Sequence, residues 1–341
     1  MQLKKFIPPI TVVLIWTGNN IVTKLSAGAV DPGSMSFLRW LLAWIVIAPF
    51  VLPSAWRQRR EIAPHLPKLA ILSLLGLAMY QGLGYYAAKT MSATNIGLFI
   101  SFIPLFTLGL SVVALRAWPT VTSMIGALVS LCGVIWLLSR GDPVSLRSHG
   151  IGIGEGMMLV ASLAYALYNV LLRKWPVPLT NWTSLFMQVT FAVLLLLPLK
   201  LLSQPVALTP GGLMMIAYAG IGASVIVPFM WLAGTAAIGP AGMTSFTNLV
   251  PVTTALASVV FLGEELHGYH FVGGGLALMG VILTQLRPGR VEPQRPRRVE
   301  SRAVDVVLQT PTHRRGESRV PDRNASEPAE KNSNEQAEKV G

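Results

Sequence analysis

The sequence predicts an all-α integral membrane protein with ten transmembrane helices, arranged as two inverted five-helix repeats. The prediction rests on a low content of charge, on apolar segments of membrane-spanning length, and on the repetition of those segments. Of the 341 residues, 52% are hydrophobic and only 12% are charged, about half the charged share of a typical soluble domain. A soluble core cannot accommodate ten such segments, because they would have no side that faces water.

Each of the ten apolar segments is long enough to cross a hydrocarbon layer of roughly 30 Å as a helix. The expected spans are 6–26, 34–53, 68–88, 94–115, 120–139, 151–172, 182–202, 211–234, 240–262 and 267–286. The second of them is expected to end at Pro53. A polar link after the fifth span divides the chain into a first repeat, 1–140, and a second repeat, 150–287.

The end of the first repeat aligns without a gap on the end of the second, at an offset of 147 residues. The matched pairs include Phe99/Phe246, Pro104/Pro251, Thr107/Thr254, Gly126/Gly273 and Gly133/Gly280. Because each repeat has an odd number of spans, the second copy enters the membrane from the opposite side. This is the inverted-repeat plan of many secondary transporters, whose substrate site lies near the midplane between the copies.

Charged residues outside the apolar segments indicate orientation and partners. With the N-terminus inside, eleven basic residues of the membrane part face the cytoplasm and six face the other side, which predicts that both termini are cytoplasmic. The tail, 288–341, is polar and poor in apolar residues, so we expect it to be disordered. The net charge of +12 does not indicate nucleic acid, since the basic residues sit at span ends and in the tail, near a lipid bilayer.

Signals of soluble enzymes are absent from the sequence. It has no phosphate-binding glycine loop, no HExxH, no CxxC and no nucleophile elbow. His267 and His270 are three residues apart without further ligands nearby, and Cys132 is the single cysteine. We therefore expect no disulfide, no metal, no cofactor and no enzymatic activity.

The strongest candidate site surrounds the two matched prolines, Pro104 and Pro251. A proline removes one backbone hydrogen bond inside a span, and interrupted helices at corresponding places in two repeats point to a transporter's binding site. Asn248 and Thr244 precede Pro251 by about one and two turns, and Ser101 matches Asn248 in the first repeat. We predict helix breaks at the prolines and substrate contacts at these three polar residues.

A second candidate set comes from the first and sixth spans. Asn20 and Lys24 are four residues apart and therefore share a helical face, and Asn169 and Arg173 repeat the spacing. One interpretation is a polar seam along a central cavity. The other is that the two cations extend from span ends to the interfaces.

Aromatic and charged residues in other spans have two interpretations each. Tyr80, Gln81 and Trp231 would suit a cavity for an amphipathic or aromatic solute, or they belong to the interfacial aromatic belts. Arg39 would meet an anionic substrate group, or it caps or anchors its helix. Glu155 is a candidate for proton coupling, although it is close to the start of its helix, where a carboxylate suits the positive end of the dipole.

Together these features resemble the drug/metabolite transporter superfamily in its ten-helix EamA-type branch. The resemblance covers residues 1–287. It rests on the duplicated unit, the proline-centred spans ending at Leu262-Gly263-Glu264, the paired glycines, the Trp16…Asn20…Lys24 pattern and Arg39. The chain departs from symmetry where Ala117-Trp118 stands in place of Glu264-Glu265, and this favours a structural role for Glu264.

The resemblance implies a secondary transporter that moves small metabolites, amino acids or drugs, by export and alternating access, through a cavity lined by both repeats. It implies a multi-pass protein of a bacterial-type inner membrane with a small-molecule substrate, acting as a monomer or a homodimer. The alternative from another class is a membrane-embedded enzyme that acts on lipid-linked substrates.

Overall fold

The structure is a computed structural model that describes residues 3–116, 118–144, 151–203 and 209–286, all of which belong to one compact unit. Every regular element within these residues is helical. The predicted tail, 288–341, lies outside them, so its disorder stays a prediction, as do the limits of the two repeats.

The first half of the chain forms the first five spans, and the third and fourth of these are built from several helical pieces. The elements are η1 (Leu3–Phe6), α1 (Ile7–Ala29), α2 (Pro32–Arg57), α3 (Arg59–Ile62), η2 (Ala63–His65), α4 (Leu66–Ser73), η3 (Leu74–Met79), α5 (Tyr80–Ala87), α6 (Ala93–Phe99), α7 (Phe102–Leu115) and α8 (Val121–Leu138). The wide-turned segment η3 is π-helical and lies between α4 and α5 in the third span.

The second half repeats this arrangement. Its elements are α10 (Ile153–Lys174), α11 (Asn181–Leu202), α12 (Pro210–Ala217), η4 (Tyr218–Ile226), α13 (Val227–Thr247), α14 (Val250–Leu262) and α15 (Gly268–Leu286). Again a π-helical segment, η4, occupies the third span of the half. The helix α13 kinks at Gly239, where a positive φ of 78° separates the eighth span from the ninth. Glycine adopts this backbone conformation without the steric cost that a side chain would add.

Nine helices of the described part are long and apolar enough to cross a membrane, and a shorter apolar helix, Gly268–Thr284, follows them. The expected all-α membrane fold is confirmed. The expectation that the second span ends at Pro53 is wrong, because α2 contains both Pro49 and Pro53 and continues to Arg57. A proline removes one hydrogen bond to the preceding turn, and a membrane helix tolerates that loss where neighbouring groups satisfy the freed carbonyl.

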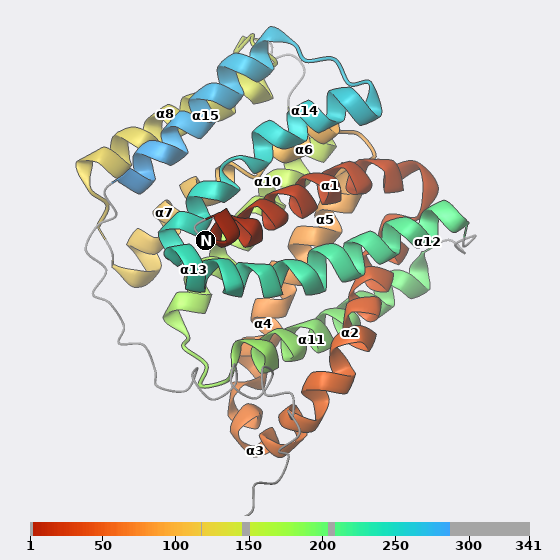
Figure 1. Cartoon of the computed structure of the whole chain (residues 1–341). Helices are drawn as coiled ribbons and strands as arrows, with labels where there is room; N and C mark the ends of the chain where they lie inside the picture. Colours follow the sequence, from red (N-terminus) through yellow and green to blue (C-terminus); the bar gives the residue numbers. More distant parts are fainter. Residues whose placement is uncertain (1–2, 117, 145–150, 204–208, 287–341) are drawn as a thin grey trace, which may run out of the picture. The chain divides into compact units, whose positions relative to one another are not determined.

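The contact between α8 and α15 displays the two-fold relation between the halves most directly. A methyl group added to Gly126 would meet the carbonyl oxygen of Gly280 at 2.6 Å, and one added to Gly133 would meet that of Gly273 at 2.6 Å. Gly126 and Gly273 are sequence equivalents, as are Gly133 and Gly280, so each contact is the image of the other. This reciprocity defines an isologous contact about a two-fold axis, and Figure 1 shows the two helices side by side.

The other contacts between spans obey the same relation. The first span, α1, packs against α13 and α14, and its counterpart α10 packs against α5 and α7. The second spans of the two halves, α2 and α11, pack against each other. Spans from both halves therefore alternate around the centre, which is the arrangement that places a site between the copies.

One end of the bundle collects the link before α6, the first turn of α10 and the segment that follows α14. The ammonium group of Lys24 donates to the carbonyl oxygens of Ala88 and Met91 there. A methyl group on Gly154 would lie 2.7 Å from the Cγ atom of Met91, and Glu264 accepts a hydrogen bond from the amide of Ala93. We call this end the Lys24 end and the other the opposite end.

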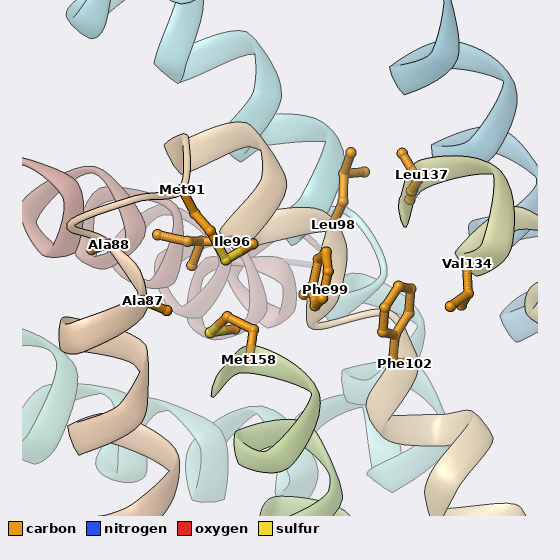
Figure 2. Packing of buried hydrophobic residues seen from close by; sticks show 10 residues of the cluster. All are labelled: Ala87, Ala88, Met91, Ile96, Leu98, Phe99, Phe102, Val134, Leu137 and Met158. Carbon is orange, nitrogen blue, oxygen red and sulfur yellow. The ribbon is translucent and has the colours of Figure 1, made fainter. Parts of the chain in front are cut away.

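An apolar cluster fills the space between the two pieces of the fourth span and their neighbours α8 and α10. Figure 2 shows Phe102 between Phe99 and Val134 of α8, and Met158 of α10 below Met91 and Ile96. The rings of Phe99 and Phe102 lie 4.6 Å apart, centroid to centroid. The interruption of the fourth span at residues 100–101 is therefore anchored on one side by tightly packed apolar side chains.

The α8–α15 contact predicts an unusual sensitivity to a single methyl group. In the Gly280→Ala variant the new Cβ would collide with the backbone of Gly126 and Ser130, which cannot move without separating the helices. We expect a loss of about 1–3 kcal/mol in the free energy of unfolding, measured as a lower melting temperature in detergent. Gly275→Ala in the same helix is the matched control, because no atom lies within 4 Å of its added methyl. Equal shifts for the two variants would contradict this account of the packing.

Candidate functional site

Two helix interruptions stand at equivalent places in the halves. In the fourth span α6 ends at Phe99 and α7 begins at Phe102, and in the ninth span α13 ends at Thr247 and α14 begins at Val250. Ser101 and Asn248, the equivalent polar residues of the predicted site, stand at these interruptions. Ser101 is buried and Asn248 is half-buried.

The structure moves each break away from its proline. Pro104 is the third residue of α7 and Pro251 is the second residue of α14, so each proline lies in the first turn of a helix. A proline in a first turn lacks only an N–H group that has no intrahelical partner anyway. The prediction of breaks at the prolines themselves is therefore corrected: each break lies two to four residues before its proline, and the proline helps to start the second piece.

The backbone groups at the first interruption find partners within the protein. The amide of Ser101 donates to the carbonyl of Leu98 at 3.0 Å. The carbonyl of Phe99 accepts a hydrogen bond from the hydroxyl of Ser162 at 3.3 Å, and Ser162 is a fully buried residue of α10. Because hydrocarbon offers no water to such groups, Ser162 stabilises the interruption from across the interface between the halves.

Two side-chain contacts join the first span to the ninth, just after the second interruption. The Asn20 amide donates to the hydroxyl of Thr254 at 3.0 Å, in a buried position. One turn earlier in α1, the hydroxyls of Thr17 and Thr253 lie 2.5 Å apart. A methyl group on Gly97 would lie 2.8 Å from the Thr254 side chain. Spans one, four and nine therefore meet at Thr254, and Figure 1 shows α1 beside α14 and α6.

The four residues of the predicted polar seam, Asn20, Lys24, Asn169 and Arg173, do not lie together in one row. The Lys24 ammonium group donates to the carbonyls of Ala88 at 3.0 Å and Met91 at 2.7 Å, so it binds the link between the third and fourth spans. Arg173 is exposed and lies in the last turn of α10. Asn169 is half-buried on the same helix. The two cations thus occupy different ends of the bundle, as the two-fold relation requires.

Two aromatic pairs also obey that relation. Trp16 of the first span and Trp231 of the eighth have ring centroids 5.7 Å apart. Tyr165 of the sixth span and Tyr80 of the third have centroids 4.4 Å apart. Tyr168 extends the second pair, at 5.3 Å from Tyr165. The predicted aromatic residues therefore pack between spans from opposite halves instead of forming only interfacial belts.

The sequence left Arg39 with two interpretations, contact with an anionic substrate group or a cap or anchor of its helix, and the structure places it at the centre of a polar cluster. Its side chain is 1% exposed. One terminal nitrogen donates to Gln81 and to the Tyr85 hydroxyl, both at 2.9 Å. The other donates to Ser224 at 2.9 Å and to the carbonyl of Ala219 at 3.3 Å. The signal available in the sequence was a charged residue inside an apolar segment, which is a functional candidate by default.

Two further candidates have local hydrogen-bonding or capping positions. Glu155 is the third residue of α10, in its first turn, where its charge suits the helix dipole. The Thr244 hydroxyl donates to the carbonyl of Pro240 at 2.9 Å within its own helix. Neither observation tests their predicted roles in coupling and binding. Among the described residues no three His, Cys, Asp or Glu side chains are grouped so as to hold a metal ion.

Glu264 joins the two halves of the chain at the Lys24 end. Its two carboxylate oxygens accept hydrogen bonds from the amides of Ala93 at 2.6 Å and Thr94 at 3.0 Å. The Thr94 hydroxyl donates to the carboxylate at 2.8 Å and also lies 2.6 Å from the Ser258 hydroxyl. A carboxylate from the second half thus caps the N-terminus of α6 in the first half, which is the structural role that its asymmetry suggested.

Burial and hydrogen bonding act on this carboxylate in opposite directions. Burial raises the pKa of Glu264, but hydrogen bonds from the backbone of Thr94 and Ala93 and from the side chains of Thr94 and Ser258 outweigh it. The pKa therefore lies below its ordinary value of 4.5. Glu264 is ionised at neutral pH and holds the α6 terminus as a charged acceptor.

Comparison with known proteins agrees with this geometry. A family model described as "EamA-like transporter family" matches residues 7–139 and again 152–286. The chain belongs to the EamA-like transporter family. One match lies on each side of the polar link after the fifth span, which supports a membrane transporter assembled from two copies of one unit.

The similar proteins are transporters by name. An uncharacterized transporter of Archaeoglobus fulgidus is 26% identical over 277 residues, covering 80% of this chain and 94% of that protein. The uncharacterized transporter YyaM of Bacillus subtilis is also 26% identical, over 79% of this chain and 89% of its own length. The uncharacterized inner membrane transporter YedA of Escherichia coli K12 is 23% identical over 80% and 88%.

The fold is also found among solved structures. A structure titled only "Crystal structure of protein" matches 83% of this chain and 96% of its own, with a TM-score of 0.55 and 21% identity. At that identity the likeness speaks for the fold alone. The multi-pass membrane assignment thus rests on the apolar helices and on the family.

The Glu264 cap predicts a stability that depends on pH. Glu264→Gln should lower the free energy of unfolding by about 0.5–2 kcal/mol at pH 7, the usual cost of losing a helix cap. Because the folded-state pKa is lowered, the stabilisation is complete above the ordinary value of 4.5 and is lost as the pH falls through the folded-state pKa.

Melting temperatures of the purified parent and variant at pH 7 and pH 4 measure this effect. We expect the difference between them to be larger at pH 7. Glu265→Gln is the matched control, because the neighbouring Glu265 side chain is exposed. A Glu264→Gln effect no greater than that of Glu265→Gln would show that the cap contributes nothing to stability.

Proposed function

We propose that the chain is a secondary transporter that exports small organic solutes across a bacterial-type inner membrane by alternating access. Its substrates belong to the metabolites, amino acids or drugs that the family resemblance implies. It acts as a monomer or a homodimer in the bilayer, with both termini in the cytoplasm. Export is the direction that the same resemblance implies.

The observation that carries the proposal is the pair of equivalent interruptions, at residues 100–101 and 248–249. An uninterrupted helix satisfies all of its interior backbone groups and offers a solute only side chains. An interruption places polar side chains at a break within the span, where a transporter with inverted repeats binds its substrate. Ser101 and Asn248 are the polar side chains at these two places.

Contacts at the Lys24 end support the alternating-access part of the proposal. Glu264 joins the ninth span to the fourth, and Lys24 joins the first span to the link before α6. Both ties are hydrogen bonds near the ends of spans. Opening this end requires that the Glu264 tie between the halves separate, while the glycine contact of α8 and α15 remains closed.

Transport in proteoliposomes tests the proposal against the alternative class. A panel of radiolabelled amino acids and aromatic metabolites is loaded inside vesicles, and exchange with external solute is followed. Accumulation that depends on the protein supports a transporter. Conversion of a lipid-linked substrate without any solute exchange would favour the membrane-embedded enzyme instead, a class that no contact in the described residues specifically supports.

We propose that Asn248 and Ser101 contact the substrate, because they are the polar side chains at the two interruptions. Asn248→Ala, and more weakly Ser101→Ala, should reduce apparent affinity without lowering the amount of protein in the membrane. Losing one uncharged hydrogen bond costs about 1 kcal/mol, which corresponds to roughly a five- to tenfold loss of affinity. The measurement is the substrate concentration dependence of exchange for a solute identified above.

Thr11→Ala is the control for these variants, because the Thr11 hydroxyl donates only to the carbonyl of Ile7 in its own helix, at 2.9 Å. It should leave affinity unchanged. An Asn248→Ala protein that binds the solute as tightly as the parent does would remove the interruption from the site and direct attention to Tyr80, Gln81 and Trp231.

The proposed orientation follows from the excess of basic residues on one side of the membrane. In a Cys132→Ala background, an impermeant thiol reagent applied to intact cells should modify Ser145→Cys in the link after the fifth span. It should not modify Ser301→Cys in the tail until the cells are opened. Labelling of Ser301→Cys alone in intact cells would reverse the orientation.

A further inference from the structure

We infer that the transported solute carries an anionic group, a carboxylate in the simplest case, and that Arg39 is the residue that recognises this charge. The inference rests on the proposed transport function and names the class of its substrate. It comes from the charge balance of the bundle and from the surroundings of the guanidinium group.

Arg39 is the fully buried permanent cation of the described residues. It is 1% exposed, and it lies two turns inside α2, which begins at Pro32. Its hydrogen bonds go to neutral acceptors: the Gln81 amide oxygen, the Tyr85 and Ser224 hydroxyls and the Ala219 carbonyl. Its Nε atom is buried without a partner in the described part of the chain. The neutral acceptors satisfy the terminal nitrogens, and the rings of Trp40 and Tyr85 lie 5.0 and 5.8 Å from the guanidinium carbon, but none of these groups supplies a negative charge.

No carboxylate of the described residues lies in the interior of a span to balance this charge. The six acidic residues all stand in links, in the short helix α3 or within a first turn: Asp31, Glu61, Asp142, Glu155, Glu264 and Glu265. Asp31 and Glu264 are already engaged as helix caps. An uncompensated buried cation is costly, and the missing negative charge is one that a solute can bring.

The surroundings of Arg39 connect it to the candidate site. Its partner Gln81 follows Tyr80, whose ring packs on Tyr165 of the other half. Gln81 and Tyr80 are only half-buried, so a solute that reaches the tyrosine pair is one side chain away from the guanidinium group. A carboxylate that displaces the Gln81 amide oxygen would keep the hydrogen bond and add the charge, and its two oxygens match the planar fork of arginine.

The same guanidinium group also holds the π-helical segment of the eighth span. The terminal nitrogen that does not face Gln81 donates to Ala219 and Ser224, both within η4. The Ser224 hydroxyl itself donates to the carbonyl of Ala219, five residues earlier. An anion bound beside Gln81 therefore contacts Arg39, which is also hydrogen-bonded to the eighth span in the second half of the chain.

A purely structural Arg39 would predict a different substrate preference. If the residue only ties the second span to the third and eighth, its removal lowers stability and reduces the binding of every solute alike. If it recognises an anion, its removal changes the ranking of solutes by charge. The ranking of solutes by charge is therefore the decisive measurement. The parent protein gives the reference ranking, with which the ranking of the Arg39 variants is compared.

The experiment uses purified full-length protein and two sets of solutes matched in shape. The first set is phenylacetate, phenylacetamide and phenethylamine, and the second is butyrate, butyramide and butylamine. Binding is measured at pH 7.5 as the rise in melting temperature with solute concentration, which depends on the ratio of concentration to Kd. We expect at least one carboxylate to bind the parent tenfold or more tightly than its amide and its amine.

The variants are Arg39→Gln, Arg39→Lys and the matched control Lys200→Gln. Lys200 is a cation near a span end whose ammonium group donates to the hydroxyl of Ser34, so its loss should leave the ranking unchanged. Arg39→Gln should bring the carboxylate-to-amide ratio close to one. Arg39→Lys should retain part of it, and this variant keeps the test open if the glutamine variant does not fold.

Three outcomes overturn the inference. They are a parent without carboxylate preference in either set, an Arg39→Gln protein that keeps the preference, and a Lys200→Gln protein that loses it equally. The proposed transport function fails separately, if folded parent protein in proteoliposomes exchanges none of the six solutes and none of the panel described above. If the protein exchanges only neutral or cationic solutes, the proposed transport function holds and only the inference of an anionic substrate is overturned.

Discussion

The structure depends on one constraint of the bilayer, that each backbone N–H and C=O group must find its partner inside the protein. Ordinary helices meet it automatically, so the instructive places are those where the helix stops. At the first interruption the amide of Ser101 turns back to Leu98, and Ser162 reaches across from α10 to the carbonyl of Phe99. At this interruption the other half of the molecule therefore supplies the partner of one backbone carbonyl.

The symmetric and the asymmetric contacts between the two halves lie at different places in the bundle. The α8–α15 contact is two-fold symmetric down to the glycine pairs, and it keeps the two backbones in direct contact. The Glu264 cap has no acidic equivalent, since Ala117 stands at the matching position in the sequence. In the proposed alternating access, a symmetric contact would be indifferent to which end of the bundle is closed, whereas the one-sided Glu264 cap would favour closure of the Lys24 end.

The duplication and the apolar lengths sufficed to predict the membrane fold, because both are periodic features that a sequence displays directly. Three site features escaped prediction, each for a physical reason. The interruptions lie before Pro104 and Pro251, because a proline in a first turn starts a helix more easily than it breaks one. The depth of Arg39 depends on how far α2 extends and which spans cover it. The segments η3 and η4 depend on tertiary contacts, and no residue pattern in the chain announces them.

The two π-helical segments carry a geometric consequence for the spans that contain them. A π-type turn accommodates one residue more than an α-type turn, and one residue corresponds to about 100° around a helix axis. Everything beyond such a segment is therefore rotated relative to a regular helix with the same start. Conversion of η3 to α-helical form would swing Tyr80, Gln81 and Tyr85 around the axis together while α4 stayed in place. The winding of η3 and of η4 thus sets which way the side chains that follow them in the third and eighth spans face.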